Sequence, residues 1–265
     1  MNGVYHSTDN GEHWTAVNTE LIYTHITDLH ALGGNLFAGT FNGIYRSTDK
    51  GELWTDGNLG MKNASIRALA MDGTTLYAGT FGGGVFLSRD GCGSWEPFLH
   101  TSEVFSLAFT TSDFYAGGRN HLFYTPRSST NWISLHYGDS VGCIYSLAAN
   151  DSTVYVGTET GRLFRTRHYG PSTWESTQIG FKDTPVNCLV FDGTTLYSGT
   201  GMGVYFSVDE GGNWTALNDG LTNSDIRTLA FKSEDLFAGT YGGGVFRSKD
   251  HGANWTPVNL SLIHI

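Results

Sequence analysis

The segment Ser7-Thr8-Asp9-Asn10-Gly11-Glu12-His13-Trp14 decides the fold, because the chain repeats its pattern. That pattern, S-x-D-x-G-x-x-W, returns intact at Ser47–Trp54, Ser207–Trp214 and Ser248–Trp255. In each copy the aspartate can accept backbone amide hydrogens across a turn, and the glycine permits a positive φ. The tryptophan offers a large apolar surface that can fill the space between neighbouring units. The pattern therefore predicts a recurrent tight turn with its own tryptophan plug.

The spacing of the tryptophans shows how large the repeated unit is. They stand at positions 14, 54, 95, 132, 174, 214 and 255, so that 37 to 42 residues separate neighbours. One unit reads as a strand over 66–71, a turn over 72–74, a strand over 76–80, a glycine loop over 82–84 and a strand over 85–88. A fourth strand follows Trp95. Four short strands joined by closely spaced turns are typical of a β-propeller blade.

The repeats predict an all-β fold, a β-propeller of four-stranded antiparallel blades. A single domain spans residues 1–265, with a half blade over 1–25 and six full repeats over 26–65, 66–103, 104–143, 144–185, 186–225 and 226–260. We favour a seven-bladed propeller with one incomplete blade. Two alternatives are six closed blades with a projecting half blade, and a natural protein that continues beyond this chain. Unpaired strand edges in a half blade predict self-association.

Composition excludes several classes of protein. Glycine supplies 36 of 265 residues and aromatic residues supply 14%, which is too apolar for a disordered chain. A net charge of −10 argues against a nucleic-acid partner, and no apolar run is long enough to span a membrane. The start of the chain lacks the basic and apolar regions of a signal peptide. We therefore expect either a cytoplasmic protein or a fragment or mature form of a longer one, and the repeats favour a fragment.

The cysteines and histidines give no sign of a cofactor or metal. Cys92, Cys143 and Cys188 lie far apart in the sequence, which fits neither a disulfide framework nor a zinc site. We expect them to be small buried hydrophobic residues, with a Cys143–Cys188 disulfide as the alternative. Histidines on the connections between units are unevenly spaced, which is more typical of solvent-facing loops than of metal ligands. No cofactor is expected.

The repeated turn resembles the Asp-box (BNR) repeat of sialidases, sortilins, xyloglucanases and photosystem II assembly propellers, and the resemblance covers essentially the whole chain. It implies a bacterial protein that is secreted or periplasmic. It also implies that the box lies opposite the ligand site and is structural, through the pairs Asp9 and Trp14, Asp49 and Trp54, Asp90 and Trp95, Asp209 and Trp214, and Asp250 and Trp255.

Three copies of the turn depart from the Asp-box pattern. Cys92 replaces the glycine of one copy, and Arg127 replaces the aspartate before Trp132. Before Trp174 the pattern is lost altogether. The units over 104–185 have therefore either drifted where the remaining packing suffices or become an edge on which a partner docks.

The expected ligand site lies at the mouth of the propeller channel. In propellers the starts of the innermost strands and the loops between second and third strands line this mouth. The fourth position of each first strand is always leucine, whereas the second position varies, which suggests packing at one and adaptation at the other. The varied positions are Thr27, Arg67, Phe105, Tyr145, Asn187 and Arg227, and the loop tips add Phe41, Phe81, Arg119 and Tyr241. Arginines and aromatic rings suit a sugar or a carboxylate-bearing ligand, unless these residues merely meet water.

These observations favour a non-catalytic binding or scaffolding propeller that recognises a glycan or a protein at the channel mouth. The sequence lacks the Arg-Ile-Pro element and the third ring arginine that sialidases need. The acids expected near the mouth are Asp28, Asp139, Glu159 and Asp183, which form no pattern. A glycoside hydrolase or lyase is one alternative, and an assembly factor resembling the photosystem II propellers is another.

Asp28 stands two residues before His30, so the two side chains share one face of a strand. This pair is either a proton relay or metal fragment, or part of a wetter face beside the incomplete blade.

Overall fold

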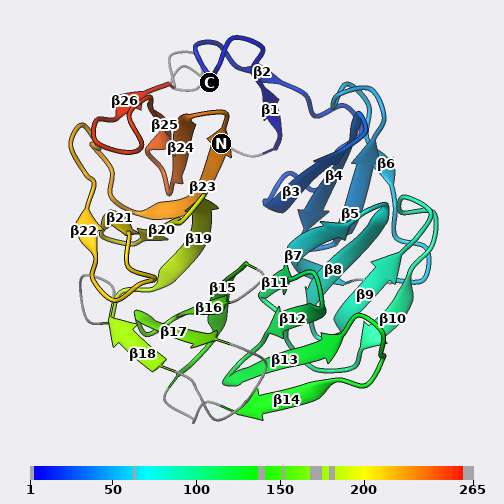
Figure 1. The fold of residues 1–265 in the computed structure, drawn as a ribbon. Helices are drawn as coiled ribbons and strands as arrows, with labels where there is room; N and C mark the ends of the chain where they lie inside the picture. The colour runs from blue at the N-terminus through cyan, green and yellow to red at the C-terminus, as the bar shows by residue number, and fades with distance from the viewer. Residues whose placement is uncertain are drawn as a thin grey trace. The chain divides into compact units, whose positions relative to one another are not determined.

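The computed structural model describes residues 3–61, 64–136, 141–150, 153–167, 175–178 and 183–258. Its strands form six four-stranded sheets and one two-stranded sheet (Figure 1), and no helix occurs in these ranges. Each four-stranded sheet follows the chain order of its strands, as in a propeller blade. The prediction of an all-β propeller with six full blades and a partial one is confirmed.

The strands follow the repeat closely. The partial blade consists of β1 (Tyr5–His6) and β2 (Thr15–Ala16). The full blades are blade 1, with β3 (Ile26–Leu32), β4 (Asn35–Thr40), β5 (Gly43–Ser47) and β6 (Thr55–Asp56); blade 2, with β7 (Ser65–Asp72), β8 (Thr75–Phe81), β9 (Gly84–Ser88) and β10 (Glu96–Leu99); and blade 3, with β11 (Ser106–Phe109), β12 (Asp113–Gly117), β13 (His121–Pro126) and β14 (Ile133–His136). They continue with blade 4, with β15 (Ile144–Ala149), β16 (Thr153–Thr158), β17 (Arg162–Arg167) and β18 (Glu175–Gln178); blade 5, with β19 (Val186–Asp192), β20 (Thr195–Thr200), β21 (Gly203–Ser207) and β22 (Thr215–Ala216); and blade 6, with β23 (Ile226–Lys232), β24 (Asp235–Thr240), β25 (Gly244–Ser248) and β26 (Thr256–Pro257).

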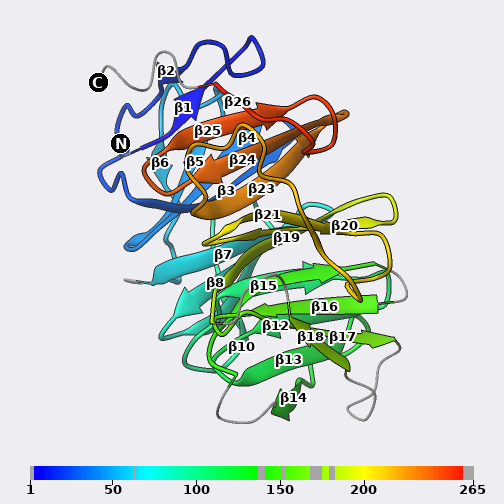
Figure 2. The ribbon, with the colours of Figure 1, turned by 90° about the vertical axis from the view of Figure 1, so that its left-hand side faces the viewer.

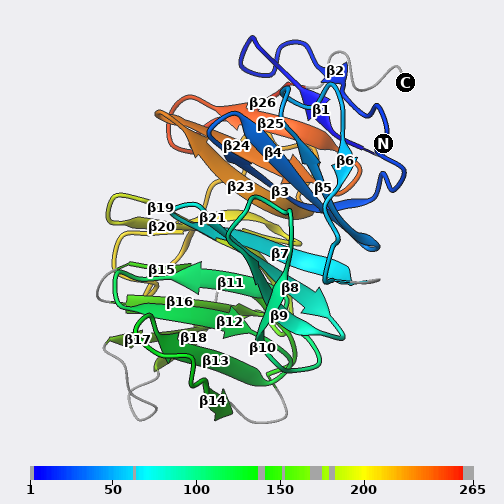
Figure 3. The same cartoon turned by 90° about the vertical axis from the view of Figure 1, so that its right-hand side faces the viewer.

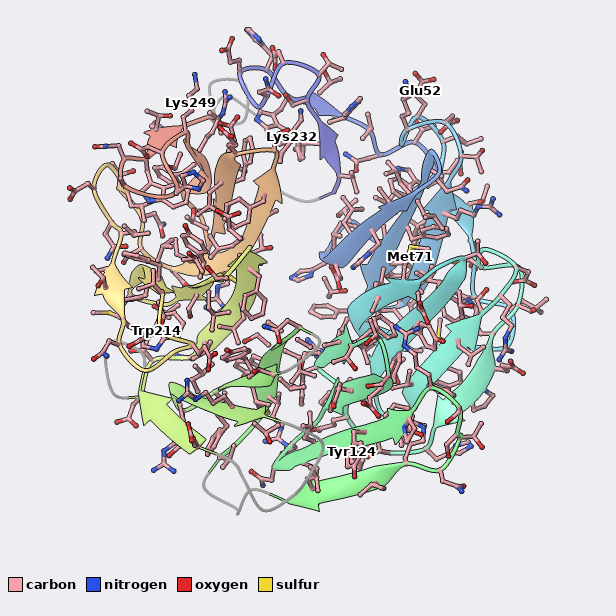
Figure 4. All side chains as sticks on the ribbon, viewed as in Figure 1. Glu52, Met71, Tyr124, Trp214, Lys232 and Lys249 are labelled. Atoms are coloured by element: carbon pink, nitrogen blue, oxygen red, sulfur yellow. The ribbon has the colours of Figure 1, made fainter. Side chains whose placement is uncertain are left out.

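The chain divides into two compact units. The first comprises Met1–Ser7 and Trp14–Ser134 and contains blades 1 and 2 with most of blade 3 (Figure 3). The second comprises Thr8–His13 and Leu135–Ile265 and contains blades 4, 5 and 6 (Figure 2). In this unit Lys232, which is labelled in Figure 4, donates a hydrogen bond to Asn10 Oδ1 at 2.7 Å. The turn of the first box is thus held beside the end of β23.

Successive blades interlock through a glycine in four of the second strands. A Cβ on Gly39 would lie 2.7 Å from Cγ2 of Ile66, which opens the next blade. Val104 approaches Gly79, and Ile226 approaches Gly199, in the same way. A side chain at these glycines would push the blades apart. Close packing between blades therefore explains why glycine recurs at this position of the second strand.

The box turns have the geometry that the sequence predicts. In blade 1, Asp49 Oδ1 accepts hydrogen bonds from the Ser47 hydroxyl at 2.7 Å and from the Leu53 amide at 3.0 Å. Gly51 has φ +96°, a conformation that side chains disfavour. In other copies the hydrogen bonds from the Asn213 amide to Asp209 and from the Asn254 side chain to Asp250 hold the pKa of each carboxyl at about 2.

Most box tryptophans join their blade to the preceding one. Trp54 is 1% exposed, and its indole Nε1–H donates to the Val17 carbonyl at 2.7 Å. Trp95 and Trp255 make the equivalent bonds to the carbonyls of the preceding blades. Trp214, labelled in Figure 4, differs because it is half-buried and donates to Gly211 of its own turn at 3.1 Å. The expected plug is therefore confirmed for three intact or nearly intact boxes. Trp214 also packs against the core of blades 4 and 5 and differs only in its hydrogen-bond partner, while Trp174 lies outside the described residues.

The cysteines are free, and Cys92 and Cys143 are buried while Cys188 is half-buried. The expectation of small hydrophobic residues is confirmed, and the alternative of a Cys143–Cys188 disulfide is wrong. Burial raises the pKa of the Cys92 and Cys188 thiols to about 12. Within the described ranges, no helix is long and apolar enough to cross a membrane.

Candidate functional site

The variable second residue of the first strand lies at a β-bulge in five of the blades. The pairing with the second strand shifts there, for example between Ile66 and Ala68 on either side of Arg67. A bulge bends the strand and re-aims the side chain it carries. The same shift surrounds Thr27, Tyr145, Asn187 and Arg227. Sequence reasoning found these positions through their variability but had no signal for the bulge itself.

The bulges lie at one end of each blade, which we call the rim end. In blade 2, for example, the start of β7 at Ser65, the end of β8 at Phe81 and the start of β9 at Gly84 all lie at this end. The box turn follows Ser88 at the other end of β9. Asp-box and rim residues are therefore separated by the length of a strand, as the sequence predicts.

At the rim end of blades 1 and 2, four side chains gather into what we call the Arg67 cluster: His25, Phe41, Arg67 and Phe81. The Arg67 guanidinium carbon lies over the Phe41 ring, 4.7 Å from its centroid, and over the Phe81 ring at 5.3 Å. His25 stacks on Phe41 with ring centroids 4.3 Å apart and an interplanar angle of 25°. His25 is one of the histidines on the connections between units, which the sequence predicts to face solvent; it is exposed, but it belongs to this cluster.

The charge of Arg67 has no carboxylate partner within the part of the chain that the structure describes. Its Nε is buried and finds no hydrogen-bond acceptor, whereas its Nη atoms are neither buried nor hydrogen-bonded. Phe41 and Phe81 remain 43% and 47% exposed. The aromatic faces attract the cation and fix the plane of the guanidinium, while its Nη end remains open to a ligand.

Two of the other rim arginines, Arg227 and Arg119, are neutralised. Arg227 donates to Asp225 Oδ2 at 2.8 Å and lies over the Tyr241 ring at 5.0 Å. Arg119 Nε donates to Glu103 Oε2 at 2.8 Å. An ion pair already satisfies each of these guanidinium groups in part, so Arg67 is the better anion receptor of the three.

The remaining rim positions contribute less to a site. Asn187 Nδ2 donates to the Ile226 carbonyl at 2.7 Å, which ties blade 5 to blade 6. The Thr27 hydroxyl is buried without a partner. Phe105 and Tyr145 are half-buried. The structure thus brings together Arg67 with Phe41 and Phe81, and Arg227 with Tyr241.

Two of the acids expected near the mouth, Asp28 and Glu159, are engaged by backbone amides. Asp28 accepts the Leu29 amide at 2.8 Å and the Leu69 amide of the next blade at 2.7 Å. Burial raises the pKa of Asp28, and the Leu69 amide opposes this effect. Glu159 accepts the Cys143 amide at 3.0 Å. Both carboxylates therefore stabilise the backbone through these hydrogen bonds.

Two further acids were expected near the mouth. Asp183 is exposed, and Asp139 lies outside the described residues. Among the residues that can be described, no group of three His, Cys, Asp or Glu side chains could hold a metal ion.

A pocket elsewhere on the surface offers no better site. It lies at the box end of blade 2, between Leu87, Asp90 and Trp95. Hydrogen bonds from the Ser94 hydroxyl and amide engage Asp90 and lower the pKa of its carboxyl to about 2. The Asp90 carboxylate of this pocket is therefore already hydrogen-bonded within its own turn.

Comparison with known proteins identifies the fold. No family model and no curated protein matches the chain. Among solved structures, the extracellular domain of the putative one component system BT4673 from B. thetaiotaomicron is 22% identical with a TM-score of 0.76, over 93% of this chain and 36% of that one. The chain thus spans about a third of the length of that structure.

Two other structural neighbours have different roles. YCF48 bound to D1 peptide is 15% identical with a TM-score of 0.73, over 93% of this chain and 86% of that one. An ancestral GH74 enzyme is 16% identical with a TM-score of 0.69, over 97% and 51%. At such identities the likeness concerns the fold, so the chain is a β-propeller whose structural neighbours include an extracellular domain, a peptide-bound protein and an enzyme.

Proposed function

We propose that this chain is a non-catalytic binding module, an Asp-box propeller that recognises a glycan or a protein through the rim end of its blades. The observation that carries the proposal is the Arg67 cluster. Its guanidinium is held over two half-exposed phenylalanine rings, its charge has no carboxylate partner among the described residues, and its Nη groups remain open. A cation that is fixed in place with free N–H donors is preorganised for a ligand that supplies the acceptor.

The Asp-box assignment rests on the turns. Each intact box whose hydrogen bonds are described places its aspartate against the backbone amide four residues later. Export from a bacterial cell is part of the proposal, and it draws support from the extracellular domain of BT4673.

Binding is favoured over hydrolysis because three carboxylates near the rim already have partners within the fold. Glycoside hydrolases place two carboxyl groups on either side of the scissile bond, where each must act on the sugar or on water. Asp28 and Glu159 instead accept backbone amides, and Glu103 is paired with Arg119. The assembly-factor alternative stays within the proposal as the case in which the ligand is a protein.

A binding screen with simultaneous product analysis tests the proposal. The purified chain is screened against glycans, polysaccharides and peptides, and the same wells are analysed for cleavage. The expected result is binding without product, lost in Arg67→Ala and retained in the control Arg89→Ala, whose arginine pairs with Glu96 at the box end of blade 2. Both variants should melt close to the wild type. Cleavage in the wells, or binding that survives Arg67→Ala, would contradict the proposal.

A further inference from the structure

The open end of Arg67 has a defined shape. Its Nε is buried beneath the cluster, and its two Nη groups carry the N–H donors that are neither buried nor bonded. These donors lie side by side in one plane, and contacts with the Phe41 and Phe81 rings hold that plane. A planar fork of this kind matches the two oxygens of a carboxylate end-on.

From this geometry we infer that the ligand at the Arg67 cluster carries a carboxylate, and that it is the uronic acid unit of an acidic glycan. The inference rests on the proposed binding function and names the ligand class for that site. The carboxylate oxygens accept from both Nη groups of Arg67. The sugar ring then lies against the exposed part of Phe81, whose apolar face suits the C–H groups of a pyranose.

Charge favours a carboxylate over a phosphate. The cluster offers one uncompensated guanidinium, and the whole chain carries a net charge of −10. A field of that sign repels a doubly charged phosphate more strongly than a singly charged carboxylate. Sites for phosphate groups usually add backbone amides at a helix N-terminus, and the described residues contain no helix.

The local backbone favours a sugar over an extended peptide. Peptides often bind by adding a strand to an open sheet edge. At this end of blades 1 and 2 the second and third strands are joined by tight turns, closed by hydrogen bonds from Thr40 to the Gly43 carbonyl and from Thr80 to the Gly84 carbonyl, each at 2.9 Å. These turns present side chains to a ligand, in particular Phe41 and Phe81.

The chain contains its own control for this inference. Arg227 occupies the equivalent strand position in blade 6 and also lies over an aromatic ring, that of Tyr241. There Asp225 already supplies the carboxylate that we assign to the ligand of Arg67. Blade 2 has Ser65 at the position of Asp225, so its arginine keeps an open fork.

The test measures binding of trigalacturonate by calorimetry, with the methyl-esterified trimer as the matched neutral probe. Esterification and Arg67→Lys should each weaken binding by about tenfold or more, because both remove the charge-assisted bidentate pair. Lysine keeps the charge but loses the fork, so its effect reports the geometry. Arg227→Lys should leave the affinity within about twofold of the wild type. Melting curves of both variants confirm that they are folded.

Several outcomes would overturn the inference. It is wrong if the ester binds as tightly as the acid, or if Arg67→Lys and Arg227→Lys have equal effects. It is also wrong if an acidic peptide, and no uronate, binds in an Arg67-dependent manner, although the proposed binding function would then stand. Failure of trigalacturonate together with the whole glycan and peptide panel would overturn both.

Discussion

Replacing Trp54 with phenylalanine tests how the boxes hold the blades together. Trp54 is 1% exposed, and its Nε1–H bond to the Val17 carbonyl joins blade 1 to the partial blade. Phenylalanine leaves that carbonyl without its donor, which costs about 1–3 kcal/mol in a buried setting. It also leaves a cavity of roughly 40 Å³, worth about 1 kcal/mol at 24 cal/mol per Å³. The free energy of unfolding should therefore fall by about 2–4 kcal/mol.

Trp214→Phe is the matched control. Trp214 is half-buried and packs against the core that blades 4 and 5 share, but its indole N–H donates to Gly211 within its own turn. Its replacement should cost less than that of Trp54, since the lost hydrogen bond does not join two blades. The two variants change the same chemical groups in the same motif, so the difference between them isolates the hydrogen bond to the preceding blade.

Urea unfolding followed by circular dichroism measures both variants, because the signal does not depend on the tryptophan that is removed. The midpoint of Trp54→Phe should fall well below that of Trp214→Phe, while the slope with urea stays unchanged. Equal losses in the two variants, or a loss below about 1 kcal/mol for Trp54→Phe, would refute the account of the box as a link between blades.

Four further predictions concern the box turns and the Cys92 thiol. Gly51→Ala should lower the free energy of unfolding, measured in urea, by about 1–3 kcal/mol, because φ is +96° and the new Cβ would lie 2.9 Å from Val17. Gly91→Asn should raise the same free energy by about 0.4–1 kcal/mol, because φ is +66° at a position where other boxes have side chains. The pKa of Asp209 is lowered from 3.8 to about 2, so its contribution to stability is present above pH 3.8 and is lost as the pH falls through 2. The urea midpoints of wild type and Asp209→Ala should therefore converge on acidification, and a gap that stays constant down to pH 2 would contradict this. Cys92, whose pKa burial raises to about 12, should react with a thiol reagent only on unfolding, and rapid reaction in the native state would show that it is accessible.

Much of the fold could be predicted because each unit carries its own local signals. The box fixes the turn between third and fourth strands, and a glycine in four of the second strands makes room for the next blade. Trp214 shows the limit of this reasoning, since its sequence pattern is intact but its indole bonds within its own turn. The partner of an indole depends on the preceding blade, and a motif does not encode that surface.

The sequence was enough to predict which arginines lie at the rim, but not which of them are paired with an acid. Variability at one strand position pointed to Arg67 and Arg227 alike. Asp225, two residues before Arg227, was a visible hint that this charge is paired, whereas the bulge that lets the two side chains meet was not. Arg119 pairs with Glu103, which also forms an isolated bridge with Phe81, and sequence spacing alone does not show either contact.

The central claim is that ligands bind through the open guanidinium of Arg67. The most direct measurement is nuclear magnetic resonance of the arginine side-chain N–H groups during titration with whichever glycan or peptide binds in the screen. The account predicts that the Arg67 signal shifts with ligand concentration while those of Arg227 and Arg89 stay in place. Saturable binding that leaves the Arg67 signal unmoved, or that moves the Arg227 signal instead, would contradict it.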